Sequence, residues 1–178
     1  MLDDQAQEGR CDLRRYVVMG VSGCGKSEIG RRLARRLGLA YIEGDEHHSP
    51  ESISRMAAGM PLTDDDRHEW LLTLQSLVRR AAQRNQGLVL TCSALKRRYR
   101  DMLRAGDPAL EFIHLHGDPA LIAARMKQRT GHFMPAELLE SQLRDLEPLA
   151  ADQRAIRIDI DAEPDAIVDQ IVQKIAAV

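Results

Sequence analysis

Short apolar stretches alternate with longer amphipathic stretches along this chain. Five of the short stretches are mostly apolar, which is typical of strands covered on both faces of a sheet. These predicted strands are Tyr16–Met19, Leu39–Glu43, Leu88–Cys92, Leu110–Leu115 and Ile156–Ile160. Strands that alternate with helices predict an α/β fold, in which helices flank a five-stranded, parallel, doubly wound sheet.

Between the strands, apolar residues recur at the spacing of an amphipathic helix. The clearest case runs from Arg67 to about Arg84, with Trp70, Leu74 and Val78 in one stripe. The other predicted helices are Pro50–Ala58, Lys96–Arg104, Pro119–Gln128, Ala136–Leu146 and a last one from about Pro164. Ligands of such sheets bind beyond the carboxyl ends of the strands, so candidate site residues are sought there.

The first predicted strand leads into Gly20-Val21-Ser22-Gly23-Cys24-Gly25-Lys26-Ser27, a full match to the P-loop pattern G-x-x-x-x-G-K-[ST]. Its backbone N–H groups turn toward phosphate oxygens, Lys26 reaches the β- and γ-phosphates, and the Ser27 hydroxyl ligates Mg²⁺. Apolar residues follow at helical spacing, so the loop opens a helix whose N-terminal dipole favours anions. All eight residues are therefore predicted to bind ATP rather than to form a turn without a ligand.

Composition narrows the class of protein. The 178 residues predict one domain over 15–178, after a flexible segment at 1–14. A net charge of −2 argues against a general nucleic-acid binder, and the arginines at 31, 32, 35 and 36 fit the solvated face of a helix. Three cysteines without metal-like spacing indicate a reduced, cytoplasmic protein, and no apolar run is long enough to span a membrane.

Two acidic residues stand at the end of the second predicted strand. Glu43 and Asp45 are two apart, so both are expected to leave the strand on the same side, near the γ-phosphate if this strand lies near the first. One carboxylate would then hold Mg²⁺ through water, and the other would accept a proton from a substrate hydroxyl. Capping of the next helix explains the acids equally well. The adjacent His47 and His48 point different ways, which disfavours a metal site.

The segment before the long helix contains an arginine that local structure does not explain. Thr63 or Asp64 makes a good N-cap, and acids in the first turn complement the helix dipole. Arg67 has no such role. An arginine beside acids at the rim of a site is suited to binding a carboxylate with two hydrogen bonds.

Small and hydroxyl residues follow the third predicted strand, in Cys92-Ser93-Ala94-Leu95-Lys96. They suit a surface that a polar ligand approaches, whereas Cys92 itself is expected to be buried and inert. On the fourth strand His114 and His116 share a face, and a structural pair is favoured over a metal pair.

Two arginines end the helix predicted at 119–128. Arg125 and Arg129 are four apart, and Thr130–Pro135 then break the helix before the next one. This arrangement predicts a small helical lid around 125–140, whose arginines stabilise the transferring phosphoryl group. The alternative is two solvated arginines.

Several segments together resemble the gluconokinases, small P-loop enzymes that make 6-phosphogluconate from D-gluconate and ATP. The resemblance runs from about Tyr16 to the C-terminus, and its motifs are far more specific than the P-loop alone. They are Glu43-Gly44-Asp45 with His48, Pro61-Leu62-Thr63-Asp64-Asp65-Asp66-Arg67 with Trp70-Leu71, Cys92-Ser93-Ala94-Leu95-Lys96, and Gly131-His132-Phe133-Met134.

The resemblance implies a three-layer P-loop NTPase fold like that of shikimate kinase and nucleoside monophosphate kinases, often in a homodimer. It implies phosphorylation of D-gluconate at the 6-hydroxyl, with Lys26, Asp45 and the lid arginines as catalytic residues. Glu43 falls near the position that binds Mg²⁺ through water. The implied acceptor side comprises Asp45, His48, Arg67, Ser93, Lys96 and His132.

The chain departs from the family pattern at four positions on the acceptor side. Ser49 stands where the family usually has Pro, Ser52 where it has Asn, Arg55 where it has Lys, and Glu69 where it has Pro. Another small acceptor therefore stays an alternative: a different sugar acid, shikimate or a nucleoside monophosphate. A nucleotide-sensing switch is a further alternative, although the Asn-Lys-x-Asp segment that reads guanine is missing.

Overall fold

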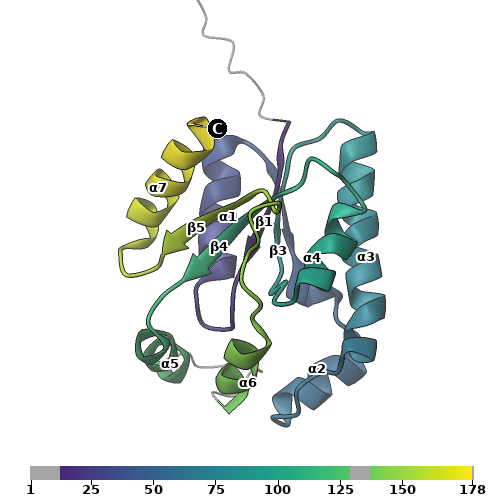
Figure 1. Cartoon of the computed structure of the whole chain (residues 1–178), viewed down its shortest axis with the longest axis vertical. Helices are drawn as coiled ribbons and strands as arrows, with labels where there is room; N and C mark the ends of the chain where they lie inside the picture. Colours follow the sequence, from purple (N-terminus) through teal and green to yellow (C-terminus); the bar gives the residue numbers. More distant parts are fainter. Residues whose placement is uncertain (1–12, 129–136, 178) are drawn as a thin grey trace, which may run out of the picture.

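The computed structural model describes residues 13–128 and 137–177, and these form a three-layer α/β fold around one parallel sheet (Figure 1). The predictions for residues 1–12, Arg129 and His132 lie outside these ranges. The sheet has the order β2-β3-β1-β4-β5, with every neighbouring pair parallel. Its strands are β1 (Arg15–Met19), β2 (Ala40–Glu43), β3 (Leu88–Thr91), β4 (Glu111–His116) and β5 (Ala155–Asp159).

Each predicted helix is present, with ends that move by a few residues. One short 3-10 helix, η1 (Gly44–His47), follows β2 directly. The α-helices are α1 (Lys26–Leu37), α2 (Pro50–Ala57), α3 (Asp64–Gln83), α4 (Arg97–Arg104), α5 (Pro119–Gln128), α6 (Glu137–Asp145) and α7 (Pro164–Ala176). None of the helices in the described part of the chain is long and apolar enough to cross a membrane.

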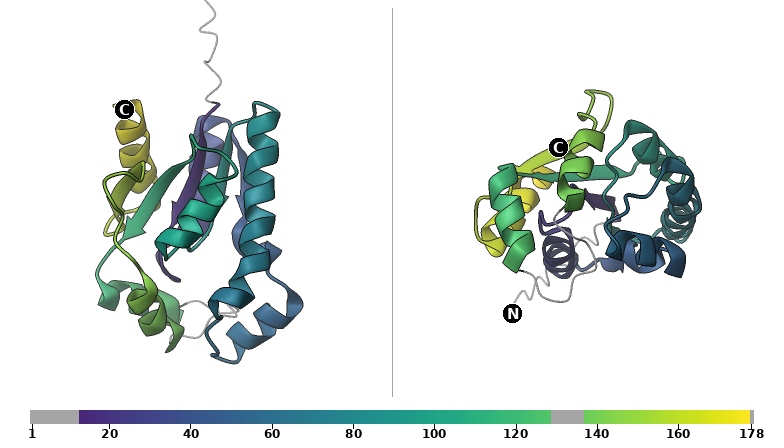
Figure 2. Two further views of the ribbon diagram at one scale, coloured as in Figure 1. Left: turned by 45° about the vertical axis from the view of Figure 1, so that its right-hand side comes forward. Right: turned by 90° about the horizontal axis from the view of Figure 1, so that it is seen from below.

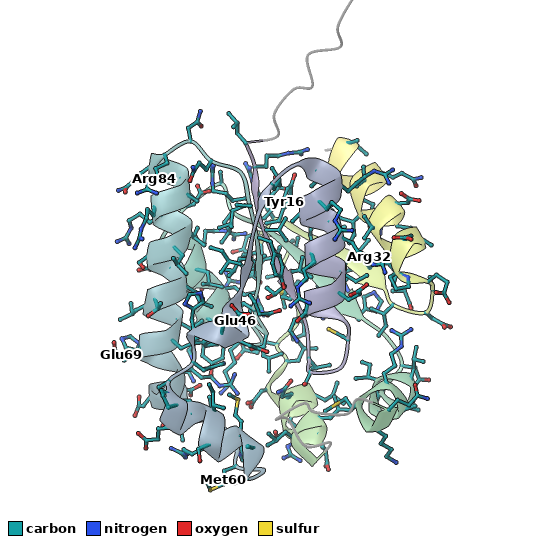
Figure 3. All side chains as sticks on the ribbon, turned by 180° about the vertical axis from the view of Figure 1, so that it is seen from behind. Tyr16, Arg32, Glu46, Met60, Glu69 and Arg84 are labelled. Carbon is teal, nitrogen blue, oxygen red and sulfur yellow. The ribbon has the colours of Figure 1, made fainter. Side chains whose placement is uncertain are left out.

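The apolar core is divided between the two faces of the sheet. Successive residues of a strand face opposite sides, so Val18 packs with α1 and α7 while Val17 packs with α3 and α4. Tyr16 lies at the centre of the molecule in Figure 3 and is fully buried. Burial on both faces explains why the three central strands, β1, β3 and β4, are rich in apolar residues, whereas the edge strand β5 alternates and is largely unburied.

The start of α3 differs from the prediction because the first turn of this helix is polar. The helix begins at Asp64 and not at Arg67, with Thr63 as its N-cap. Thr63 Oγ1 accepts a hydrogen bond from Asp66 N at 3.2 Å, and Asp66 Oδ2 accepts one from Thr63 N at 2.7 Å. This capping box fixes the helix start one turn before the apolar stripe begins.

The arginines of α1 form a solvent-facing surface, as predicted. Arg32, labelled in Figure 3, donates to Glu28 and to Asp165 of α7, both at 2.6 Å. Arg36 forms an ion pair at 3.1 Å with Asp169, which also belongs to α7. These exposed pairs join the two helices of one layer, and each contributes little to stability on its own.

The sheet order determines which loops meet. β3 lies between β1 and β2, so the second strand is not a direct neighbour of the first. The carboxyl ends of all five strands still meet at one edge of the sheet, where α2, α5 and α6 are arranged (Figures 1 and 2). The loops at this edge form the candidate site.

Candidate active site

A partly open pocket lies at the carboxyl edge of the sheet. Segments from most of the chain line it: the P-loop, η1, α2, the start of α3, the end of β3, and α6. Six of the residues predicted from the sequence meet here, namely Ser22, Lys26, Asp45, His48, Arg67 and Ser93. The fold therefore joins the phosphate loop to most of the predicted acceptor side.

The P-loop has the backbone shape that its sequence predicts. Gly25 has φ +94°, a left-handed conformation that favours glycine, and it forms the N-cap of α1. The loop is attached to the neighbouring strand by a hydrogen bond from Gly20 N to Ser93 O at 3.3 Å. Lys26 Nζ donates to Val21 O at 3.0 Å, so this ammonium group lies over its own loop.

Glu43 lies beside Ser27, the residue whose hydroxyl the P-loop pattern predicts as a Mg²⁺ ligand. Tyr41 OH donates to Glu43 Oε2 at 2.7 Å, Thr91 Oγ1 donates to Oε1, and the carboxylate also interacts with the Ser27 side chain. Burial alone would raise the pKa of Glu43, but these hydrogen bonds and the charge of Arg31 outweigh it and hold the pKa below its ordinary value. A carboxylate and a hydroxyl provide the hard oxygen atoms that Mg²⁺ prefers, so this pair fits the ion.

Glu43 and Asp45 both lie beside the P-loop, but the alternation of a single strand is not the reason. The strand ends at Glu43 and Gly44 opens η1, so the alternation of a strand does not extend to Asp45. A Cβ atom on Gly44 would lie 2.0 Å from Thr91 O, which only glycine avoids. Glu43 consequently faces Ser27, whereas Asp45 lines the pocket with Lys26.

His48 is buried against an aromatic ring. It stacks on Trp70 with 4.1 Å between ring centroids and 19° between planes, and its Nε2 lies 3.9 Å from Asp45 Oδ1. Burial lowers the pKa of His48 to about 4; Asp45 opposes this shift and Arg67 adds to it. Trp70 Nε1 donates to Gly44 O at 2.8 Å, so the same aromatic ring contacts both the histidine and the turn that carries Asp45.

Arg67 brings a buried positive charge to the pocket. Its Nε donates to Leu62 O at 3.4 Å, and its guanidinium lies 5.8 Å from the centre of the Tyr99 ring. Among the side chains that the structure describes, no carboxylate forms an ion pair with Arg67, which is 7% exposed. A buried guanidinium with this environment is suited to an anionic group of a ligand.

Lys96 lies beside the pocket rather than in its lining. Its Nζ donates to Asp64 Oδ1 at 3.1 Å and lies 3.9 Å from Asp145 Oδ1.

Cys92, which directly follows β3, is buried, and burial raises the pKa of its thiol to about 12. The cysteine is therefore a core residue, as the sequence indicated.

Arg125 of the predicted lid is directed toward the last strand. Its Nη2 donates to Ile160 O at 3.0 Å, just beyond β5. The other lid arginine, Arg129, and His132 belong to the part of the chain that the structure does not describe. α5 and α6 flank that part and lie at the carboxyl edge of the sheet, as a lid requires (Figure 1).

Gln142 of α6 is a pocket residue that the sequence reasoning missed. Ser22 N in the P-loop donates to Gln142 Oε1 at 2.7 Å, and the glutamine is 6% exposed. A signal for it exists, because Gln142 continues the apolar stripe of Leu138, Leu139 and Leu146, where a polar residue is unusual. The hydrogen bond connects the phosphate loop to the helix after the predicted lid.

An apolar contact between α2 and α6 closes the pocket on the outer side. Met56, Leu62 and Leu138 form a small buried cluster of their own, separate from the two main parts of the core. Met60, by contrast, is exposed at the tip beyond α2 (Figure 3). The pocket therefore combines a polar interior with an apolar outer wall.

Three of the four departures from the family pattern, Ser49, Ser52 and Arg55, form local hydrogen bonds. Ser49 caps α2 by accepting a hydrogen bond from Ser52 N at 3.1 Å, and the two hydroxyls are 3.0 Å apart. Arg55 donates to Asp66 Oδ1 at 2.9 Å, which connects α2 to the capping box of α3. Ser49 and Arg55 are not among the residues that line the pocket.

The parallel sheet order, the P-loop and the flanking helices define a P-loop kinase of the shikimate kinase type, and a family model described as shikimate kinase matches residues 22–176. The chain is 43% identical to the gluconokinase of Gluconobacter oxydans (strain 621H) over 92% of each chain. It therefore belongs to the gluconokinase family.

Solved structures agree with this assignment. A sugar kinase from Janibacter sp. HTCC2649 matches with a TM-score of 0.86 and 46% identity, over 90% of this chain and 92% of that one. A gluconokinase from Sinorhizobium meliloti 1021 matches with a TM-score of 0.82 and 45% identity over 92% of each chain. A deoxyadenosine kinase from M. mycoides, at 15% identity and a TM-score of 0.65, shares the fold.

Proposed function

We propose that this protein transfers the γ-phosphoryl group of ATP to the 6-hydroxyl of D-gluconate, giving 6-phospho-D-gluconate and ADP. The observation that carries the proposal is the buried Arg67, without a carboxylate partner in the described residues, in one pocket with Asp45 and Lys26. Gluconate has a carboxylate at one end and the reacting hydroxyl at the other. The resemblance to gluconokinases along the chain supports the same acceptor.

The protein's part in phosphoryl transfer is positioning and charge stabilisation. The backbone N–H groups from Gly23 to Ser27 and the Lys26 ammonium hold the phosphates. Asp45 orients the acceptor hydroxyl toward the γ-phosphorus and accepts its proton as the new P–O bond forms. Arg67 binds the gluconate carboxylate, and Ser93 adds a hydroxyl to the acceptor side.

Ser27 would hold Mg²⁺ directly and Glu43 would hold it through a water molecule. When bound, the ion neutralises charge on the β- and γ-phosphates. The carboxylate of Glu43 is kept ionised by its hydrogen bonds, so it is ready for this role at neutral pH. Lys96 contributes at the edge of the acceptor side through its pair with Asp64.

The lid completes the proposed site. Closure of the segment around 125–140 brings Arg125 and Arg129 to the triphosphate and His132 to the acceptor, and it excludes water from the reacting groups. Such closure requires Arg125 to exchange Ile160 O for a phosphate oxygen. We also propose a cytoplasmic homodimer. The family resemblance supports the dimer, and the buried Cys24 and Cys92, which form no disulfide within the described residues, support a reducing compartment.

Product analysis tests the proposal. The protein is incubated with Mg-ATP and D-gluconate, ADP release is followed, and the position of the new phosphate is determined by phosphorus and carbon NMR. We expect stoichiometric ADP and 6-phosphogluconate. Release of ADP without a phosphorylated gluconate, or no release at all, would contradict the proposed function.

A further inference from the structure

The clearest feature that the proposed mechanism does not use is the contact between His48 and Asp45. His48 is held on one side by the stack on Trp70, and its Nε2 points to Asp45 Oδ1 across 3.9 Å. The other ring nitrogen, Nδ1, is fully buried and has no hydrogen-bond partner among the described residues. Nε2 is therefore the ring nitrogen that faces a proposed reacting group, and that group is the carboxylate of Asp45.

We propose that His48 is a positioning residue for Asp45, which donates a hydrogen bond from Nε2–H to the Asp45 carboxylate and aims it at the acceptor hydroxyl. The inference rests on the proposed function in the role of Asp45 only. It differs from the role implied by family resemblance, in which His48 binds the acceptor directly.

The surroundings of His48 favour the neutral ring that this role needs. Burial and the nearby charge of Arg67 both disfavour the imidazolium, against the opposite effect of Asp45. A neutral imidazole has one N–H group, and a carboxylate 3.9 Å from Nε2 favours the tautomer with the proton there. Catalytic hydrogen bonds are often long without substrate and shorten in the reactive complex, so 3.9 Å is compatible with a bond formed during turnover.

Trp70 gives the pair a common support. Its indole Nε1 donates to Gly44 O, one residue before Asp45, while its ring face packs on His48. The turn that carries the carboxylate and the ring that orients the carboxylate are thus held by one side chain. Because a small displacement of a reacting group is costly in rate, such a support has a catalytic effect.

Variants at position 48 distinguish a role of the His48 Nε2 atom from a role of its Nδ1 atom. His48→Gln places an amide at the distance of Nε2 from the backbone, His48→Asn places one at the distance of Nδ1, and His48→Phe keeps only the stack. We expect His48→Phe and His48→Asn to lower kcat about tenfold with less than a threefold change in the gluconate KM. His48→Gln should recover most of the turnover. A large rise in the gluconate KM with kcat intact would instead make His48 a substrate-binding residue and overturn the inference.

A double-mutant cycle excludes a merely structural effect. If His48 acts through Asp45, His48→Phe should cost little more in the Asp45→Asn background, where the carboxylate is already lost. Full additivity of the two losses would overturn the inference, and thermal unfolding of each variant controls for folding. A failure of the proposed function can be told apart from a failure of this inference, because in the former case the wild-type protein does not phosphorylate gluconate. The same cycle then applies to whichever small acceptor the wild type does phosphorylate.

Discussion

The two halves of the pocket are built in different ways. The phosphate half is one continuous loop of eight residues, whose backbone N–H groups and one lysine are suited to phosphate oxygens. The acceptor half takes single side chains from η1, α3, α6 and the end of β3, which are far apart in the sequence. A continuous loop is specified by local conformation, whereas the acceptor half exists only after the sheet has formed.

The two halves also differ in the hydrogen bonds that their positively charged side chains make. Lys26 of the phosphate half finds a partner within its own loop, at Val21 O. Within the residues that the structure describes, the buried Arg67 of the acceptor half makes one weak hydrogen bond, to a carbonyl 3.4 Å away. Binding of a small acid would satisfy that charge, so the acceptor half defines the substrate, and variants should separate the two halves.

The largest expected effect comes from Asp45, where the two halves meet. Asp45→Asn should lower kcat by about 10²–10⁴-fold, because the amide cannot accept the hydroxyl proton. The KM for ATP should stay within about threefold of wild type, since the P-loop is untouched. Steady-state kinetics with both substrates measures this, and near-normal turnover would remove Asp45 from the mechanism.

On the phosphate side, Lys26→Met should lower kcat by about 10²–10³-fold, since it removes a charge from the transferring phosphoryl group. The gluconate dissociation constant, measured by calorimetry without nucleotide, should not change. Weaker gluconate binding in that measurement would show that the two halves are not separate.

On the acceptor side, Arg67→Met should raise the gluconate KM by about 10–100-fold through loss of charge-assisted hydrogen bonds. The KM for ATP should be unchanged. Arg67→Lys is the matched control: it keeps the charge but not the planar pair of donors, so it should recover only part of the affinity. An unchanged gluconate KM in Arg67→Met would exclude Arg67 as the carboxylate site.

A smaller effect is expected at Gln142, which connects the halves. Gln142→Leu removes the hydrogen bond to Ser22 N but keeps the size of the side chain. Loss of one such bond should raise both KM values by about 3–10-fold. Gln142→Glu, which retains an acceptor oxygen, should keep the gluconate KM near wild type. An effect of Gln142→Leu on one substrate alone would argue against a connecting role.

A lower pH should have the smallest effect on activity. It should, however, measurably reduce the free energy of unfolding. The pKa of His48 is lowered to about 4, mainly by burial, and burial has the same effect on His114 of β4. As the pH falls, these histidines therefore become protonated in the unfolded chain before they do so in the folded chain. The free energy of unfolding consequently decreases as the pH falls from about 6.5 toward 4. We expect a loss of about 2 kcal/mol per histidine between pH 7.5 and 5 in urea unfolding. His114→Asn should reduce that loss, and an unchanged pH dependence would show that His114 titrates normally.

Local patterns were enough to predict the framework of the molecule. The apolar runs gave all five strands, and the P-loop sequence gave its own conformation, because both depend on neighbouring residues. The N-cap of α3 was also correct at Thr63, although the apolar stripe placed the helix start one turn late, at Arg67. Polar first turns carry no apolar signal, which explains this error.

Other features depend on contacts that a sequence pattern does not contain. The direction of Asp45 follows from the approach of Gly44 to Thr91, a residue 47 positions away. Lys96 is paired with Asp64, 32 positions before it, and this pair keeps it beside the pocket. Gln142 was recognisable only as a polar residue in an apolar stripe. These contacts lie on the acceptor side or between it and the P-loop, and they form only when the fold brings distant segments together.

The central claim is that the acceptor half selects a small polyol acid, and a comparison of acceptors tests it most directly. kcat/KM is measured at fixed Mg-ATP for gluconate, other sugar acids, shikimate and nucleoside monophosphates. We predict that gluconate exceeds shikimate and the nucleotides by at least about 100-fold. A preference for one of those two classes, or slow ATP hydrolysis that no acceptor accelerates, would contradict the claim.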